Sequence, residues 1–195
     1  MPFRPYIAGR VEAYHTLDVD RGVQNVDFVA DAQDMAPVPS EAYDMVMSSQ
    51  VLEHVREPER ALAEMWRVLR PAGTLILTVP FLSRLHEEPF DFYRFTTYGL
   101  RFLLERARFE IVEIVPSGSV FSFLGHQVST GLVCSVWHIP LFRDVVFWLN
   151  TAVFTLPLYG LDRLLRMERK IPLNYVVLAR KAGATSRVTE GYSSR

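Results

Sequence analysis

The densest group of side chains that could carry chemistry in this 195-residue chain lies in one short segment, 86–95 (HEEPFDFYRF). His86 is the natural candidate for a general base, because an unperturbed imidazole titrates near neutral pH. Tyr93 and Arg94 could orient an acceptor molecule, and Asp91 adds a carboxylate. The alternative is a loop held by an Asp91–Arg94 ion pair with phenylalanines packed under it. We favour function, because so polar a loop beside so apolar a strand needs some partner.

A second group of polar side chains ends an apolar run in the sequence YDMVMSSQVLEHV (43–55). The side chains that leave the expected strand are Ser48, Ser49 and Gln50. Small residues here allow a cofactor to approach the backbone, and the alternative is a simple connection to the next helix. His54, which follows Glu53, could accept a proton, but capping or packing beneath that helix explains it at least as well.

Two acids follow two further short strands. Asp18 could accept hydrogen bonds from both hydroxyls of a ribose, because a carboxylate is a two-pronged acceptor. Asp31, followed by Ala32, could accept from the exocyclic amine of an adenine. The alternatives are a turn or cap acid at Asp18 and an Asx-turn at Asp31. Asp20 and Asp34 are weaker candidates, since both lie further from the strand ends.

Apolar runs that alternate with amphipathic segments predict the elements that must position these groups. Strands are expected at 14–19, 26–30, 43–47, 74–79, 109–115 and 174–179. One helix is expected at 58–70, where Pro58 suits the first turn, and a second begins at Thr96 or Thr97. Strands separated by helices indicate an α/β fold with a mostly parallel sheet and helices on both faces.

The segment 116–172 breaks this alternation and is rich in Phe, Val, Leu and Trp. We expect two or three helices inserted between the last two strands. The uncharged run 145–161 is shorter than the about 20 residues that a membrane span needs, and it contains Pro157, so an interfacial or core helix is expected. The insertion could be a lid or a platform for peripheral membrane contact. It could also only pack over the sheet or form a homodimer.

Domain organisation and composition narrow the function further. The predicted α/β domain comprises 1–115 and 173–182, and a flexible polar tail covers 183–195. Charged residues make up 22% and hydrophobic residues 49%, and a net charge of −1 with scattered basic residues argues against a nucleic-acid partner. The single cysteine, Cys134, excludes an internal disulfide framework and a cysteine-built zinc site. The first residues lack the apolar core of a signal peptide, so a cytoplasmic location is expected.

Several stretches, in their order and spacing, resemble the type 11 branch of the class I S-adenosylmethionine (SAM) methyltransferases. They are 17–20 (LDVD), 29–34 (VADAQD), 43–55, 65–73 (MWRVLRPAG) and 91–96 (DFYRFT). The resemblance implies a Rossmann-like fold, SAM as the cofactor, and a small-molecule or lipid-linked methyl acceptor. It implies no required metal.

The same resemblance assigns roles to the candidate residues. It implies that Asp18 binds the SAM ribose and that Asp31 and Ala32 lie near the adenine. The methionine part of SAM would be lined by Ser48, Ser49 and Gln50. The acceptor side would be formed by His86, Asp91, Tyr93 and Arg94, with His86 as the catalytic base.

The chain departs from this family at its beginning. The family's central first strand and its Gly-x-Gly loop precede the Asp18 strand, but here only 17 residues do, with Gly9 as their one glycine. Two strands should then keep unpaired inner edges, at about 1–3 kcal/mol for each unmade buried hydrogen bond, and SAM binding should weaken. We favour a true start upstream of Met1. The alternatives are a catalytically inactive domain with a binding or membrane-associated role, or sheet halves that close on each other or pair with another chain.

Overall fold

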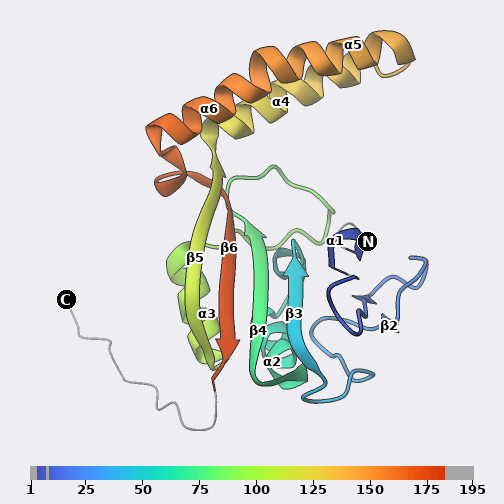
Figure 1. Cartoon of the computed structure of the whole chain (residues 1–195), viewed down its shortest axis with the longest axis vertical. Helices are drawn as coiled ribbons and strands as arrows, with labels where there is room; N and C mark the ends of the chain where they lie inside the picture. The colour runs from blue at the N-terminus through green and yellow to red at the C-terminus, as the bar shows by residue number, and fades with distance from the viewer. Residues whose placement is uncertain (1–3, 8, 183–195) are drawn as a thin grey trace, which may run out of the picture.

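The computed structural model describes residues 4–7 and 9–182, so the tail predicted at 183–195 lies outside the described residues. In that part of the chain the main sheet has the strand order β3 (Tyr43–Ser49), β4 (Leu69–Pro80), β6 (Pro172–Lys181) and β5 (Phe109–Ser119) (Figure 1). β3 and β4 are parallel, whereas β6 is antiparallel to both of its neighbours. Three of the four strands therefore point the same way, which confirms the predicted α/β class with a mostly parallel sheet.

The two helices of the α/β unit cover one face of this sheet. α2 (Pro58–Val68) and α3 (Thr97–Arg106) pack against each other and against β4 and β5, behind the sheet in Figure 1. Leu77 and alternate residues of β4 are fully buried on this side, whereas Met45 of β3 is half exposed on the other. Helices were expected on both faces, but neither α2 nor α3 covers the second face. Residues 9–42, which precede β3, form turns and two very short strands instead of helices.

The N-terminal region forms a small sheet of its own. β1 (Leu17–Asp18) and β2 (Phe28–Val29) make a parallel pair, preceded by the short helix α1 (Arg4–Ile7). Among the described residues no strand ladder joins this pair to β3, so β3 has the unpaired edge that the sequence predicted. A cavity of about 250 Å³ lies between the small sheet and that edge. β1 and β2 have two residues each and are shorter than the strands predicted at 14–19 and 26–30.

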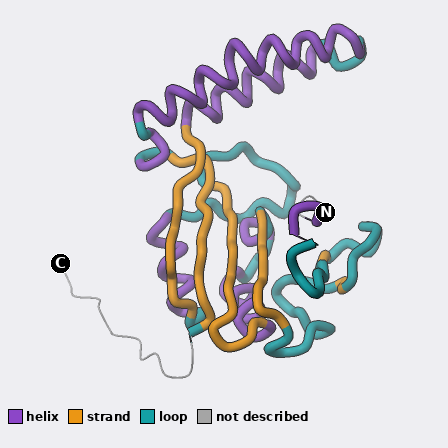
Figure 2. Tube along the Cα trace, in the orientation of Figure 1, coloured by secondary structure: helices purple, strands orange, loops and turns teal. Residues whose placement is uncertain are grey.

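The insertion between β5 and β6 is a helical hairpin that projects from one end of the sheet (Figures 1 and 2). Its elements are α4 (Val120–Ser135), α5 (Pro140–Asn150), the π-helix η2 (Thr151–Thr155), α6 (Leu156–Leu165) and the 3₁₀ turn η3 (Met167–Arg169). α6 packs against α4, where Gly125 allows a close approach: a Cβ there would lie 3.3 Å from Leu158 Cδ1. The expected helices between the last two strands are therefore present.

The second arm of the hairpin continues through Pro157, the residue that counted against a membrane span in the sequence. Proline lacks an amide hydrogen and clashes with the carbonyl four residues earlier in an α-helix. The preceding turn widens to a π-helix, in which the Leu156 amide donates to the Thr151 carbonyl, and this widening accommodates the ring. The resulting helix, Phe142–Leu165, has 24 residues, and its most apolar 18-residue window has a mean hydropathy of 1.3. It is long and apolar enough to cross a membrane by length and composition alone.

Candidate functional site

Two loops meet at the carboxyl edge of the parallel strands. The first follows β3 and contains the 3₁₀ turn η1 (Leu52–His54), and the second follows β4 and covers 81–96. The Phe92 amide donates to the Glu53 carbonyl over 2.9 Å, and the Tyr93 hydroxyl donates to the Arg56 carbonyl over 2.8 Å. The loops are thus joined into one unit at the edge where ligands bind in open α/β sheets.

Three titratable side chains converge where these loops touch. Glu53 Oε1 lies 3.8 Å from His54 Nε2 and 4.0 Å from His86 Nε2. The two imidazole rings meet edge to face, with 4.7 Å between their centroids. Burial raises the pKa of Glu53, and the nearby His54, His86 and Arg94 only partly offset that effect. Of the described residues, these three bring their ligand atoms within 4.8 Å of one another and could hold a metal ion.

Asp91 and Arg94 form the loop ion pair that was weighed as the alternative to a binding role. Arg94 donates to both carboxylate oxygens of Asp91, over 2.6 and 2.7 Å. The Asp91 side chain is 2% exposed, and its carboxylate also accepts from the His86 amide. The Arg94 guanidinium holds the pKa of Asp91 far below its usual range. Asp91 therefore fixes the loop that carries His86, and acceptor binding by Asp91 or Arg94 stays a prediction.

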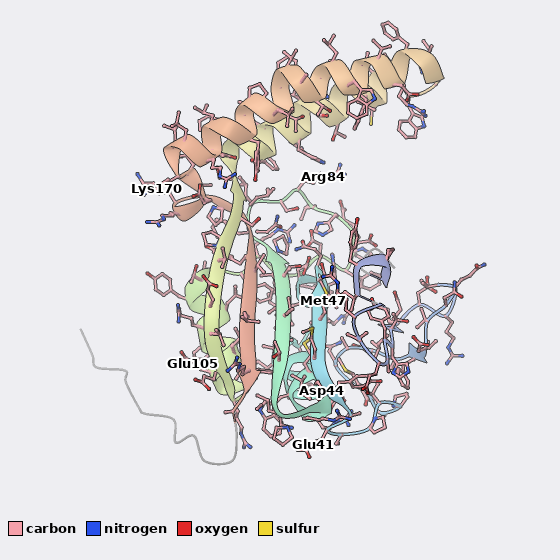
Figure 3. All side chains as sticks on the ribbon, viewed as in Figure 1. Glu41, Asp44, Met47, Arg84, Glu105 and Lys170 are labelled. Atoms are coloured by element: carbon pink, nitrogen blue, oxygen red, sulfur yellow. The ribbon has the colours of Figure 1, made fainter. Side chains whose placement is uncertain are left out.

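His86 and Tyr93 keep surfaces that a ligand could reach. The Nδ1 atom of His86 lies 3.2 Å from the Arg84 carbonyl and 3.4 Å from Asp91 Oδ2, which leaves Nε2 as the free ring nitrogen. Arg84 lies in the loop between the sheet and the helical hairpin (Figure 3). Tyr93 stacks on Phe95 and is partly exposed. A base role for His86 and an acceptor contact for Tyr93 stay predictions.

The residues predicted at the methionine part of SAM lie at the end of β3. Ser48 is buried, lines the cavity beside β3, and its hydroxyl has no hydrogen-bond partner among the described residues. The Ser49 hydroxyl accepts from Thr78 over 3.0 Å. Gln50 is exposed, has a positive φ of 53°, and its amide donates to the Thr78 carbonyl. Ser48 is thus the member of this group with an unused polar atom facing a cavity.

The two predicted nucleoside acids make local turns. Asp18 Oδ1 accepts from the Asp20 amide over 2.9 Å, and Asp31 Oδ1 accepts from the Gln33 amide over 2.8 Å. These are the Asx-type contacts considered as alternatives, and at Asp18 they leave carboxylate acceptor sites unused. Asp31 is more occupied, because the Gln33 side-chain amide also donates to both of its carboxylate oxygens, over 3.1 and 3.0 Å. Ala32 is buried and lines the same cavity as Ser48. The structure therefore brings Ala32 and Ser48 to one cavity, whereas Asp18 and Asp31 do not line it.

Sequence reasoning missed the contact between Glu53 and the two histidines. Glu53 was noted only as the neighbour of His54, and His86 was assigned to a different group. The one local signal is an acid placed beside a fully buried leucine, Leu52, at the end of an apolar run. The convergence itself depends on the pairing of two loops, which no local pattern encodes.

Comparisons with known proteins agree with this arrangement. Residues 9–77 match the family model described as a methyltransferase domain. The ubiquinone/menaquinone biosynthesis C-methyltransferase UbiE of Pseudoalteromonas translucida is 32% identical over 87 residues, which cover 43% of this chain and 33% of that protein. The demethylmenaquinone methyltransferase of Renibacterium salmoninarum is 40% identical over 53 residues, 27% of this chain and 22% of that protein. The chain thus matches about a third or less of the length of these curated relatives.

Solved structures share the fold. The [4+2]-cyclase SpnF superimposes with a TM-score of 0.52 at 24% identity, over 84% of this chain and 58% of that one. The 1,6-didemethyltoxoflavin-N1-methyltransferase of Burkholderia thailandensis, solved with S-adenosylhomocysteine, gives a TM-score of 0.53 at 16% identity, over 91% and 65%. These findings agree with the resemblance predicted from the sequence: residues 9–77 are similar to a methyltransferase domain, and the chain shares the Rossmann-like fold of the solved structures.

Proposed function

We propose that this protein transfers a methyl group from SAM to a small-molecule acceptor at the carboxyl edge of the sheet. The observation that carries the proposal is the match of residues 9–77 to the methyltransferase domain, since this stretch contains the β3 loop that meets the loop bearing His86. The alternative, a catalytically inactive binding or membrane-associated domain, is not favoured by the similarity to curated methyltransferases.

The residues around the β3 edge fit a bound SAM in part. The unpartnered Ser48 hydroxyl and the small Ala32 side chain face one cavity, as a cofactor wall would require. Asp18 and Asp31 keep carboxylate acceptors for the ribose and the adenine, and Ser49 and Gln50 lie at the strand end. When bound, SAM supplies the activated methyl group, and the chain's own contribution is to hold the acceptor in line with it.

His86 is suited to remove a proton from the acceptor. A carbonyl oxygen can only accept, so the contact with the Arg84 carbonyl places the imidazole proton on Nδ1. Nε2 is then free to accept a proton from an acceptor hydroxyl or amine. Asp91 supports this arrangement through the His86 amide, over 3.0 Å.

The finer identity of the acceptor is part of this proposal. The curated relatives are named for ubiquinone and menaquinone biosynthesis, so a quinone precursor with a lipid tail is one acceptor to test. The hairpin exposes Trp148 and other apolar side chains at the same end of the sheet, which suits a lipid-linked acceptor or peripheral membrane contact through 116–172. A homodimer formed by this surface stays a prediction, as does a cytoplasmic location.

The test is SAM binding by titration calorimetry together with methyl transfer from labelled SAM to a demethylated quinone. Asp18→Ala should weaken SAM binding tenfold or more, given about 1.5–3 kcal/mol for a hydrogen bond to a charged group. Asp20→Ala is the matched control, because Asp20 makes a similar turn contact with the Gly22 amide. Equal SAM affinity in both variants would remove Asp18 from the site. No SAM binding by the protein at all would support the inactive alternative.

A further inference from the structure

Glu53 is a buried carboxylate without the partners that burial normally demands. Its side chain is 0% exposed, and neither carboxylate oxygen has a hydrogen-bond partner among the described residues. An ionised carboxylate removed from water is costly unless it is paired or coordinates a metal. Arg94, whose charge acts on Glu53, is engaged by Asp91 through two hydrogen bonds. With both neighbouring histidines neutral, the described residues give Glu53 no cation of its own.

Two histidines aim free ring nitrogens at this carboxylate. His54 Nδ1 lies 2.9 Å from the Phe90 carbonyl, and His86 Nδ1 lies 3.2 Å from the Arg84 carbonyl. These contacts place the proton of each ring on Nδ1 and leave the Nε2 lone pairs toward Glu53 Oε1. A backbone carbonyl or carboxylate behind each imidazole is the support that metal-binding histidines have in proteins. Asp91 gives His86 a second such support, with 3.4 Å between Asp91 Oδ2 and His86 Nδ1.

We propose that Glu53, His54 and His86 bind a divalent transition metal ion. Two imidazoles and one carboxylate form a ligand set suited to ions such as Zn²⁺, Fe²⁺ or Co²⁺. Metal–nitrogen distances of about 2.1 Å bring neighbouring ligand atoms to roughly 3.0–3.4 Å from one another. The observed separations of 3.8 and 4.0 Å, within an overall limit of 4.8 Å, require only a small inward rotation of the side chains.

Three protein ligands leave coordination positions open to other molecules. The two histidines are partly exposed, so the open side of the site faces the edge where the loops after β3 and β4 meet. If the proposed methyl transfer holds, metal binding would take up the Nε2 lone pair of His86 and so replace its role as base. An acceptor oxygen could then occupy an open position, where a metal lowers the pKa of a bound hydroxyl. This extension rests on the proposed function, whereas the binding of the metal does not.

The test uses the full chain, stripped of metal by chelation, titrated with Co²⁺ and followed by visible absorption and calorimetry. We expect one equivalent of Co²⁺ to bind, and Zn²⁺ to displace it. His86→Gln and Glu53→Gln should each weaken binding by at least 10–100-fold, the loss typical of removing even an outer-shell partner. His126→Gln is the matched control, because His126 is an exposed histidine on α4. It should bind Co²⁺ as the unchanged protein does.

The outcomes separate the metal site from the proposed function. Equal Co²⁺ affinity in the unchanged protein, His86→Gln and His126→Gln would overturn the inference. His54→Gln provides a second partly exposed ligand variant if Glu53→Gln does not fold. Metal binding without methyl transfer would leave the site intact and remove the proposed function. Methyl transfer by a protein that binds no Co²⁺ would overturn the metal site and leave the proposed function intact.

Discussion

The α/β unit and the helical hairpin use the same kinds of residues in opposite ways. In the sheet, Leu77 is fully buried and the charged Glu110 is exposed. In the hairpin, Trp148 is 70% exposed and Leu164 is 78% exposed, whereas the polar Asn150 and Asp162 are buried. A structure that hides polar groups and displays apolar ones suits apolar surroundings. From this comparison we predict that the α/β unit folds around its own core and that the hairpin binds a partner surface.

The strongest test of this contrast pairs two leucines. Leu77→Ala should lower the free energy of unfolding by about 2–5 kcal/mol, because it opens a cavity in a packed core. Leu164→Ala removes the same atoms from an exposed site and should change the free energy of unfolding by less than about 0.5 kcal/mol. Chemical denaturation of both variants measures the difference. A loss of more than 2 kcal/mol at Leu164 would mean that the hairpin has an apolar core of its own.

The buried acid of the hairpin gives the next largest effect. Asp162 accepts from the Phe121 and Ser122 amides and from the hydroxyls of Ser119 and Ser122, and so caps the first turn of α4 from α6. Burial opposes ionisation, but these hydrogen bonds lower the pKa of Asp162. Asp162→Ala should destabilise the hairpin by about 3 kcal/mol, because it leaves buried donors unpaired.

Hydrogen exchange can locate that loss. Amides of α4 should lose protection in Asp162→Ala, whereas amides of β4 and β6 should keep it. Asp144→Ala is the control, since Asp144 is an exposed acid on α5. Loss of protection throughout the sheet would contradict the separation of the two regions.

The exposed apolar surface of the hairpin predicts a smaller effect, which is seen only when lipid is present. The protein should co-migrate with liposomes in a flotation assay, and Trp148→Glu should reduce that fraction severalfold, because a charge at the interface opposes insertion. Glu110→Gln, an exposed change on β5, should leave it unchanged. Absence of co-migration by the unchanged protein would mean that another protein surface, such as a second copy, covers the hairpin.

The smallest expected effect concerns pH and the loop that carries His86. Because its pKa in the folded protein is depressed, Asp91 stabilises the fold above its unfolded pKa of about 3.9, and that contribution is lost as the pH falls below this value. Asp91→Asn should remove this part of the acid dependence of the melting temperature. Asp44→Asn is the control, since the exposed Asp44–Arg70 pair contributes little. An unchanged acid profile in Asp91→Asn would show that other carboxylates set it.

Elements with a local signal could be predicted from the sequence. The predicted cap at Thr96 is confirmed: its hydroxyl accepts from the Gly99 amide over 3.0 Å. α2 begins at Pro58 as expected. The order of the strands along the chain and the helices inserted between the last two strands also follow the prediction. Periodicity, proline and capping residues act within a few positions along the chain, so these features are encoded where they form.

Features that depend on contacts between distant segments could not be predicted. The approach of His86 to Glu53 requires two loops to pair. The presence of α2 and α3 on the same face of the sheet, with neither on the other face, depends on the structure that the residues before β3 adopt. The helix through Pro157 was missed because a π turn offsets the cost of the proline. At Asp18, a local turn and a contact with a ligand would each explain an acid at this position. Sequence spacing alone could not decide between these two roles.

The position of the hairpin has a consequence for how the two reactants would arrive. β5 enters the hairpin and β6 leaves it at the edge of the sheet where the loops of Glu53 and His86 meet (Figure 1). If the hairpin rests on a bilayer, a lipid-soluble acceptor reaches this edge by lateral diffusion in two dimensions. A water-soluble methyl donor would instead enter the cavity beside β3 from the solvent. The two reactants would then be supplied independently. The reaction rate would depend on the number of acceptor molecules per lipid molecule in the bilayer, and not on the acceptor concentration in the whole solution.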